Sequence, residues 1–326
     1  DCADQRAMIS AQTLAAADAL RESFQAAKPF RHVVVDGFLE PDACEALLRD
    51  FPAFSDRYAK DEHGGVGRKA VVEGVAGVSA FYAAFYRYIN SAPFLQAMSA
   101  LTGIADLIAD PTLFGGGTHE NLSGQGLDVH IDFNIDERRM LHRRVNLLVY
   151  LNPEWDEAWG GAIELHSDPF NPAIDEFRSF LPLFNRAVLF ETNEYSWHGF
   201  RRIVLPPDKA HLSRKSFSIY LYTKDRPAEE VVAPHTTFYV AQPLPPHLRT
   251  GHTLTDDDMR ELDIRMQGRD GLLRMYQKLL IEKEQRLRDF MHVAQDAPDH
   301  AAILSSRSWK FVMALQRFKH RMLHLV

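Results

Sequence analysis

The sequence has few cysteines and no long apolar run. Its two cysteines, Cys2 and Cys44, cannot supply a thiolate zinc site or a disulfide framework. No stretch approaches the roughly 18 consecutive apolar residues that mark a membrane-spanning helix, so none is expected. The amino end lacks the basic and then apolar pattern of a signal peptide. The chain begins at Asp1 rather than Met, which leaves an upstream signal open, and we expect a cytoplasmic protein.

Positive charge is also in short supply. The 326 residues contain 37 Lys and Arg against 44 Asp and Glu, a net charge of -7 that argues against nucleic acid as a partner. With 46% hydrophobic and 25% charged residues, the composition is that of a globular protein long enough to bury a substantial core. Histidine, with 15 residues, is the conspicuously abundant residue type. Any bound metal is therefore expected to be held by imidazole and carboxylate groups.

The amino-terminal third has helical periodicity around one strand-like run. Residues 6–27 and 76–103 are predicted helices, because their apolar residues recur at helical spacing. The run at 29–39 has a strand-like apolar core, and it leads into a helix that begins near Pro41. Residues 56–68 combine charge with three glycines and predict a loop, whose glycines allow it to close over a substrate.

The centre of the chain has a different pattern. From about 112 to 224, short strand-like runs without long helices between them predict an antiparallel sandwich or barrel, and so an α+β protein. The Pro-rich stretch 234–250 predicts an extended linker, and 255–295 predicts a helix capped by Thr255. We therefore expect a domain over 1–228, followed by a linker and a helical extension over 229–326.

The segment LDVHIDFN at 127–134 carries the first sign of chemistry. His130 and Asp132 are two residues apart, so on an extended strand both side chains lie on one face. An imidazole and a carboxylate so placed supply two ligands of the 2-His-1-carboxylate triad, which holds Fe(II) with open coordination positions. The spacing alone is common by chance. A further histidine, His198, follows the strand-like run NRAVLFE and is expected at a strand end.

The strand predicted over 213–223 has two different faces. One face is apolar apart from Lys215, and the other carries Arg214, Ser216, Ser218, Tyr220 and Tyr222. Such a polar face is expected to line a cavity, where an arginine binds a carboxylate in bidentate fashion and hydroxyls complete the pocket. A second strand at 143–152 places Asn146, Leu148 and Tyr150 on one face, and a glycine pair at 160–161 fits a bend after it.

These motifs together resemble a known family. The order HxD, YLNPxW, GG, a distal histidine and an RxS strand resembles the prolyl-hydroxylase-like branch of the 2-oxoglutarate/Fe(II) dioxygenases, over roughly residues 29–227. The resemblance implies a double-stranded β-helix, or jelly-roll, core with helices against one sheet. It also implies a hydroxylase that converts 2-oxoglutarate and O2 to succinate and CO2 as it oxidises an unactivated C–H bond, with ascorbate as a candidate stimulant.

The resemblance assigns roles to individual residues. The metal ligands fall on His130, Asp132 and His198, and because Asp132 fills a position that related halogenases leave open, hydroxylation is favoured over halogenation. The arginine that anchors 2-oxoglutarate falls on Arg214. The residues implied to line the 2-oxoglutarate pocket with it are Ser218, Tyr150, Asn146 and Ser216.

Two departures concern the 2-oxoglutarate pocket rather than the metal ligands. A tyrosine common ten residues before the first ligand is Glu120 here, and the segment between His198 and Arg214 is longer than usual. Asn134 and Arg138 follow the HxD motif and are candidates for contact with the substrate. Three other histidines near the motif strands lack such company and are expected to be surface or hydrogen-bonded residues: His142, His166 and His211.

The carboxyl-terminal residues leave the substrate and the partners open. The helix over 255–295 is expected to pack on the barrel or to pair with a second copy as a homodimer. Residues 301–326 contain five Lys or Arg and no acid, a pattern of basic helices that contact a membrane surface or a partner. The run SSRSWKFVMALQRF resembles tails of bacterial enzymes of cell-surface polysaccharide assembly.

Two substrate classes and two other functions therefore remain. The substrate is either a protein side chain, prolyl-like but not collagen-like, or a small molecule or saccharide of cell-surface glycan biosynthesis. One alternative is a metal-dependent hydrolase, in which the same ligands hold Zn(II) and activate water. It does not account for the Arg, Ser and Tyr face of the strand at 213–223. The other alternative is a catalytically silent binding or assembly module that acts through its carboxyl-terminal helices.

Overall fold

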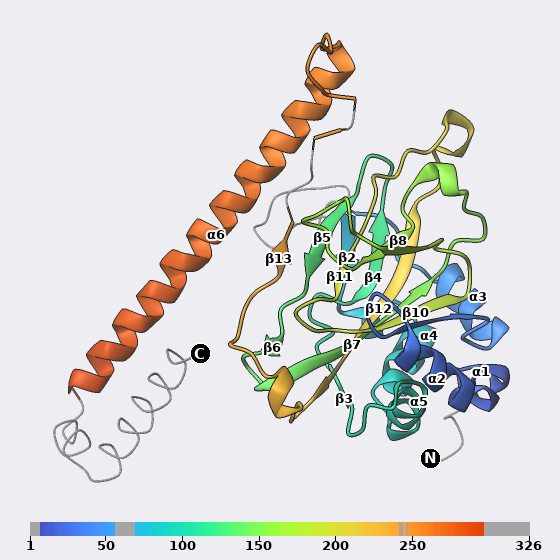
Figure 1. Ribbon diagram of the computed structural model, residues 1–326. Coiled ribbons are helices and arrows are strands. Elements are labelled where there is room, and N and C mark those ends of the chain that lie inside the picture. The colour runs from blue at the N-terminus through green and yellow to red at the C-terminus, as the bar shows by residue number, and fades with distance from the viewer. Residues whose placement is uncertain (1–6, 56–68, 241–243, 246, 297–326) are drawn as a thin grey trace. The chain divides into compact units, whose positions relative to one another are not determined.

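The computed structural model describes most of the chain (Figure 1). The described residues are 7–55, 69–240, 244–245 and 247–296. The loop predicted over 56–68 and the basic segment predicted over 301–326 lie outside them.

The chain divides into two compact units. The first unit contains residues 1–243 and the second contains residues 244–326. The first unit continues past the predicted boundary after residue 228, because the stretch predicted as a linker contributes strand β13 (Phe238–Tyr239) to one of its sheets.

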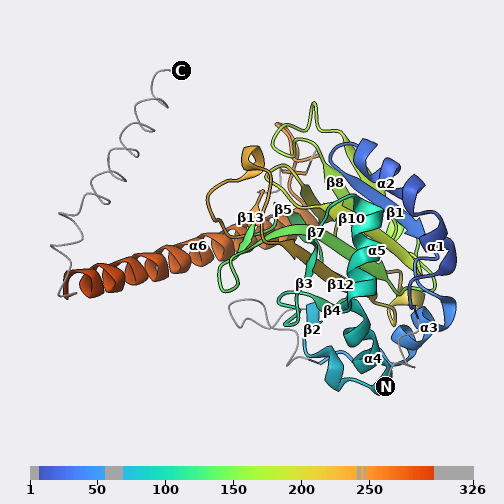
Figure 2. The ribbon, with the colours of Figure 1, turned by 90° about the horizontal axis from the view of Figure 1, so that it is seen from below.

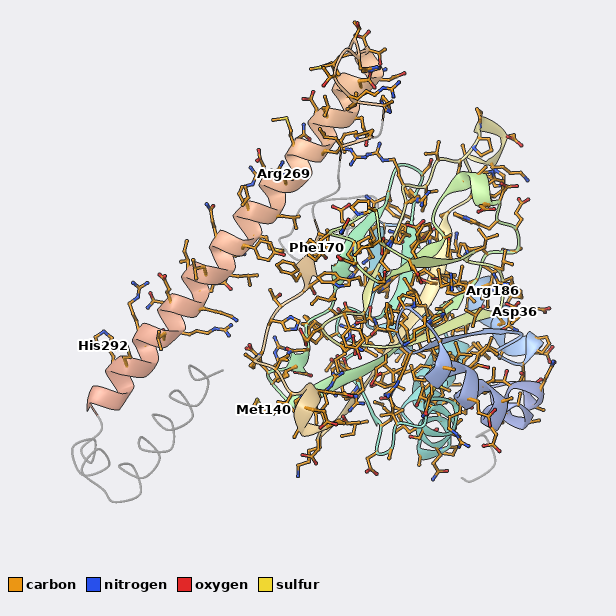
Figure 3. The ribbon with its side chains drawn as sticks, viewed as in Figure 1. Asp36, Met140, Phe170, Arg186, Arg269 and His292 are labelled. Carbon is orange, nitrogen blue, oxygen red and sulfur yellow. The ribbon has the colours of Figure 1, made fainter. Side chains whose placement is uncertain are left out.

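The larger sheet of the first unit is antiparallel and has eight strands among the described residues. They run in the order β1–β10–β7–β12–β4–β2, with β3 paired to β12 and β6 paired to β7 (Figure 1). Across its β1–β10 edge, Arg186 donates to Asp36 at 2.6 and 2.9 Å, and the two side chains meet at the surface in Figure 3. The strands are β1 His32–Asp36, β2 Lys69–Val72, β3 Ile108–Ala109, β4 Gly117–Asn121, β6 Ile135–Asp136, β7 Leu141–Tyr150, β10 Arg186–Glu191 and β12 Arg214–Thr223.

The smaller sheet is antiparallel and packs face to face against the larger one. Its order is β13–β5–β11–β8–β9, with β5 Leu127–Ile131, β8 Ile163–His166, β9 Phe177–Phe180 and β11 Trp197–Phe200. Ile163 and Leu165 of β8 are buried against Tyr150, Val188 and Phe190 of the larger sheet. Two antiparallel sheets that enclose side chains from both inner faces make the expected jelly-roll core, and the α+β fold class is confirmed.

Helices cover the outer face of the larger sheet (Figure 2). They are α1 Ala11–Ala15, α2 Ala17–Ala26, α3 Pro41–Arg49, α4 Ala80–Ile89 and α5 Ala92–Thr102. The apolar face of β12 faces them, and the ring of Phe217 lies 5.0 Å from that of Phe85 in α4. The helix predicted over 76–103 is two helices, because Pro93 lacks the N–H that a continuous helix would use and instead sits in the first turn of α5.

The helix predicted over 6–27 is also divided, between α1 and α2 at Ala16. Four short 3-10 helices connect other elements among the described residues: η1 Val75–Gly77, η2 Glu157–Trp159, η3 Pro207–Lys209 and η4 Ala228–Glu230.

The second unit contains the long helix α6, Asp256–Asp296. Its start is fixed by Thr255 and Asp258: the Asp258 amide donates to Thr255 Oγ1 at 3.2 Å, and the Thr255 amide donates to Asp258 Oδ2 at 2.8 Å. This reciprocal pair satisfies backbone donors that a helix start leaves open, as the sequence predicts. Of the described helices, none combines the length and the apolar character needed to cross a membrane.

Candidate active site

Two imidazoles and one carboxylate converge between the two sheets. His130 in β5 lies directly opposite His198 in β11, and Asp132 follows the end of β5. The Nε2 atoms of His130 and His198 lie 3.8 and 3.5 Å from the two carboxylate oxygens of Asp132. All three ligand atoms lie within 4.8 Å of one another, and both histidines are buried. The structure thus brings together the three residues predicted as metal ligands.

In both imidazoles, the nitrogen that faces the other ligands, Nε2, is unprotonated and free to bind a metal ion. Nδ1 of His130 lies 2.8 Å from the Asp128 carbonyl oxygen, and Nδ1 of His198 lies 2.8 Å from the Ser196 carbonyl oxygen. Because a carbonyl oxygen only accepts, each Nδ1 carries the proton and each Nε2 has its lone pair free. Burial, together with the neighbouring His198, lowers the pKa of His130 to about 3, and burial also lowers the pKa of His198. Both rings are therefore neutral near pH 7.

Asp132 is held in place by two side chains of β7. Arg143 Nη2 lies 3.1 Å from Asp132 Oδ2, and Asn146 donates to the same oxygen at 2.7 Å. Arg143 also donates to the Asn146 amide oxygen, so the three groups form one network. Burial alone would raise the pKa of Asp132, but the charge of Arg143 and the two histidines outweigh it and hold that pKa well below its usual range. The carboxylate is ionised and fixed.

The separations among His130, His198 and Asp132 fit a bound divalent cation. A second group of two histidines and one aspartate differs from them in this respect. In the second unit, His247 and His252 also converge on a carboxylate, Asp258, but their Nε2 atoms lie only 2.7 and 2.8 Å from its oxygens. Those are direct hydrogen bonds in which each Nε2 carries the donated proton, so neither nitrogen has a lone pair free for a metal. The separations of 3.5 and 3.8 Å at Asp132 are too long for hydrogen bonds but within the about 4.2 Å that two ligands of one ion can span.

A buried arginine without a carboxylate partner completes the site. Arg214 begins β12 and is 4% exposed; it donates to the Gly161 carbonyl oxygen at 2.6 Å and to the Tyr150 hydroxyl at 3.0 Å. Gly161 has a φ of +74°, and a Cβ there would lie 3.3 Å from Arg214 Cδ, so glycine is required for this close approach. Among the described residues, no carboxylate forms an ion pair with Arg214. A buried, uncompensated guanidinium fits an anionic ligand.

Comparison with known families decides the class of this domain. Residues 117–222 match the model of the 2OG-Fe(II) oxygenase superfamily. The matched segment contains His130, Asp132, His198 and Arg214. Residues 117–222 form a 2OG-Fe(II) oxygenase domain. The predicted superfamily is therefore confirmed for this segment, and the predicted Fe(II) and 2-oxoglutarate are the metal and co-substrate of this superfamily.

The similar proteins include two prolyl hydroxylases and one protein solved with bound 2-oxoglutarate. The chain is 27% identical over 130 residues to mouse prolyl 3-hydroxylase OGFOD1, which is 38% of this chain but only 22% of that protein. Among solved structures it is similar to a prolyl hydroxylase of Trichoplax adhaerens in complex with a peptide (16% identity, TM-score 0.45, 66% of this chain and 94% of that chain). It is also similar to HygX of Streptomyces hygroscopicus with nickel and 2-oxoglutarate bound (14% identity, TM-score 0.42, 66% and 95%).

The polar face of β12 lines the interior of the oxygenase domain. Ser216 lies opposite Tyr150 on one side and His119 of β4 on the other, and Asn121 lies opposite Arg214. The Ser218 hydroxyl is fully buried and makes no hydrogen bond with the described residues. The predicted lining residues therefore share one face with Arg214, while Asn146 supports Asp132.

Glu120 lies on the other face of the larger sheet. It pairs with Lys215 and accepts a hydrogen bond from Ser213 at 2.6 Å, so its carboxylate faces the helical layer rather than the interior. The neighbours of Glu120 in β4, His119 and Asn121, point to the interior instead. The departure noted at Glu120 therefore leaves no acid beside Arg214.

Two aromatic rings flank the histidines of the oxygenase domain. The buried Phe190 lies 4.7 Å from His198, and Tyr239 of β13 lies 5.0 Å from His130 at an interplanar angle of 31°. Tyr239 pairs with His130 in the sheet register, so both side chains lie on the inner face. This contact is not predictable from the sequence, because the Pro-rich stretch around Tyr239 predicts a linker.

The two candidate substrate residues have different surroundings. Asn134 is buried, its amide donates to the Ala233 carbonyl oxygen at 3.0 Å, and its side-chain oxygen accepts from the His235 amide at 3.0 Å. It thus fastens the segment that leads into β13. Arg138 is exposed in the turn between β6 and β7, two residues before Met140, which is labelled in Figure 3. A contact of either residue with substrate stays a prediction.

One of the histidines set apart from the metal has its own partners. His166 Nδ1 lies 2.6 Å from Asp175, and its Nε2 lies 3.5 Å from Glu164, on the outer face of β8. Burial lowers the pKa of His166, but the neighbouring carboxylates of Glu164 and Asp175 raise it by more, so the net shift is upward. His166 is a hydrogen-bonded residue outside the oxygenase interior.

Proposed function

We propose that the chain is a 2-oxoglutarate- and O2-dependent hydroxylase that oxidises an unactivated C–H bond. The observation that carries this proposal is the pairing, in one interior, of a buried 2-His-1-carboxylate donor set with the buried and uncompensated Arg214. When bound, Fe(II) would activate O2, which is the oxidant: one oxygen atom goes to 2-oxoglutarate as it loses CO2 and becomes succinate, and the other goes to the C–H bond. A zinc hydrolase needs no buried arginine, and a silent module gains nothing from such a site.

The residues of the chain position and protect the reactants. Arg214 and the Tyr150 hydroxyl would bind the far carboxylate of 2-oxoglutarate. His130, Asp132 and His198 would hold the metal on one side and leave the other side open for the co-substrate and O2. Arg143 and Asn146 orient Asp132, because each contacts the same carboxylate oxygen. Phe190 and Tyr239 shield the imidazoles from water.

Two classes of substrate are compatible with this site. The relative in mouse is named a prolyl 3-hydroxylase, which supports a prolyl side chain of a protein, and the likeness of the chain's end to polysaccharide-assembly tails supports a saccharide. The chain spans about a fifth of that relative's length, so the activity of the relative is not transferred whole. We also propose that helix α6 joins two copies of the chain.

The test is succinate release from 2-oxoglutarate with Fe(II), ascorbate and air, without a prime substrate. We expect slow turnover in the wild type that is lost in His130→Ala and in Arg214→Ala. Arg87→Ala, an exposed arginine of α4, is the matched control and retains the rate. If the wild type shows neither turnover nor binding of 2-oxoglutarate to its Mn(II)-loaded form, the proposal fails. Stimulation by a proline-containing peptide or by a saccharide then distinguishes the two substrate classes.

A further inference from the structure

Helix α6 carries a row of five long apolar side chains spaced by seven residues. They are Met259, Met266, Leu273, Leu280 and Leu287, and their exposed fractions are 48, 63, 59, 60 and 59%. Side chains seven residues apart return to the same side of a helix with a drift of only about 20° per repeat. An unbroken row of this kind over four repeats is typical of one core position of a coiled coil.

A second row, three residues after the first, is apolar and basic in alternation. It contains Leu262, Arg269, Tyr276 and Lys283. In heptad notation the first row is position a and the second is position d. Gly268 and Gly271, which weaken the helix, lie in neither row. The repeat is therefore continuous along the face where a partner helix would pack.

The charges next to the second row indicate which partner fits and in which direction. Each cation in that row is followed by an acid: Arg269 by Asp270, and Lys283 by Glu284. None of these four side chains forms an ion pair with another described residue, and Arg269 projects outward from the helix (Figure 3). In a parallel, in-register pair, a d side chain enters a hole bordered by the partner's following residue, position e. Arg269 would then meet Asp270 of a second copy, and Lys283 would meet its Glu284.

An antiparallel pair lacks this match. There the d side chains would lie beside position g of the other helix, and from Arg265 to Arg286 those positions carry arginine or leucine. The two cations would remain without acids. The charge pattern therefore selects one orientation, and because the acids come from the same sequence as the cations, it selects a second copy of this chain.

We propose that α6 is a dimerisation helix, which pairs with α6 of a second copy as a parallel, in-register, two-stranded coiled coil. The interface runs from Met259 to Leu287, about 42 Å of helix. It removes from water the five apolar side chains of the first row, and it neutralises the cations of the second. This interface does not depend on the proposed oxygenase activity, so each can fail without the other.

The first test measures the mass of the full chain in solution. Light scattering or sedimentation should give twice the chain mass of 37.1 kDa, with a concentration-dependent dissociation between about 1 and 100 µM. Leu273→Lys combined with Leu280→Lys should give a monomer. The matched control is Ile264→Lys with Ile281→Lys, which makes the same chemical change at exposed side chains outside both rows and should remain a dimer.

The second test measures orientation. Met259→Cys should form a disulfide-linked dimer on oxidation that the wild type does not form, because only a parallel pair brings the two copies of residue 259 together. Lys283→Glu should lower the dimer affinity at least about tenfold, and adding Glu284→Lys should restore it. A wild type that is monomeric throughout, a control that dissociates as the row variant does, or a charge swap without rescue overturns the proposal. Circular dichroism checks that each variant keeps its helix.

Discussion

The buried guanidinium of Arg214 leads to the sharpest prediction of the site, the effect of Arg214→Met. Methionine keeps most of the length of the side chain and removes the charge together with its donors. The wild-type side chain donates to the Gly161 carbonyl and the Tyr150 hydroxyl and has no carboxylate partner among the described residues. Its loss should therefore affect the binding of an anion far more than it affects the fold.

The loss of affinity for 2-oxoglutarate and the change in the stability of the fold can be worked out separately. Removing one partner of a buried, hydrogen-bonded charge pair costs about 2–5 kcal/mol, so at about 3 kcal/mol the affinity for 2-oxoglutarate falls roughly 150-fold. For the fold, two acceptors lose their donor at about 1–3 kcal/mol each, but a buried cation that costs several kcal/mol is removed as well. These terms oppose each other, and the melting temperature of the ligand-free variant should stay within about 5 °C of the wild type.

Calorimetric titration of 2-oxoglutarate into the Mn(II)-loaded protein measures the first quantity, and thermal unfolding without ligand measures the second. Arg87→Met removes an exposed arginine of α4 and should change neither. An affinity within about threefold of the wild type would refute the assignment of Arg214 as the anchor. A large loss of thermal stability with unchanged affinity would show instead that Arg214 serves the fold.

The other predictions concern the metal, the core, the segment before β13 and pH. Asp132→Ala should reduce Mn(II) affinity by more than the about 10–100-fold typical of an outer partner of a metal ligand, as measured by electron paramagnetic resonance. Phe217→Ala should lower the free energy of unfolding in urea by about 3–5 kcal/mol, because the ring is fully buried; a loss below about 1 kcal/mol contradicts this packing. Asn134→Ala should speed hydrogen exchange at the His235 amide, which loses its acceptor. The pKa of His166 is raised in the folded state, so its contribution to stability is complete at low pH and fades as the pH rises through that pKa; His166→Gln should cost more stability near about pH 5.5 than near about pH 8.

The strand alternation was enough to predict most of the oxygenase interior. Residues two apart on a strand share a face, and this rule correctly grouped His130 with Asp132 and placed Arg214 on the polar face of β12. The rule works for Arg214 because β12 pairs in regular register with β4 from its first residue, and it works for Asp132 although that residue lies just past the end of β5. It also predicted an antiparallel sandwich without any knowledge of which strands are neighbours.

The same rule missed Arg143, and the reason is a local irregularity. Strict alternation along β7 puts Arg144, not Arg143, on the face of Asn146. The pairing of β7 with β12 shifts register between Leu221 and Tyr222, so Arg143 lies opposite Tyr222 and reaches the interior. A β-bulge of this kind changes which residue faces inward, and nothing in a single sequence marks its position.

The composition around Tyr239 does not reveal its place beside His130. The prolines near it predict an extended chain, which is correct for the backbone, but an extended chain also pairs with an open sheet edge. The edge of β5 is formed by residues more than 100 positions earlier, so the pairing depends on tertiary structure alone. The buried amide of Asn134, two residues after Asp132, holds this segment to the site.

The buried charge of Arg214 also links the lifetime of the protein to the supply of a metabolite. A ligand that binds only the folded state stabilises it by about 2.7 kcal/mol at one hundred times its dissociation constant, and by nothing when it is absent. In the ligand-free form the fold bears the desolvation of a cation that 2-oxoglutarate would neutralise. Where 2-oxoglutarate is scarce, the unfolded fraction of the protein and its loss to proteases should rise. The carbon supply of the cell would then set the amount of the enzyme in addition to its turnover rate.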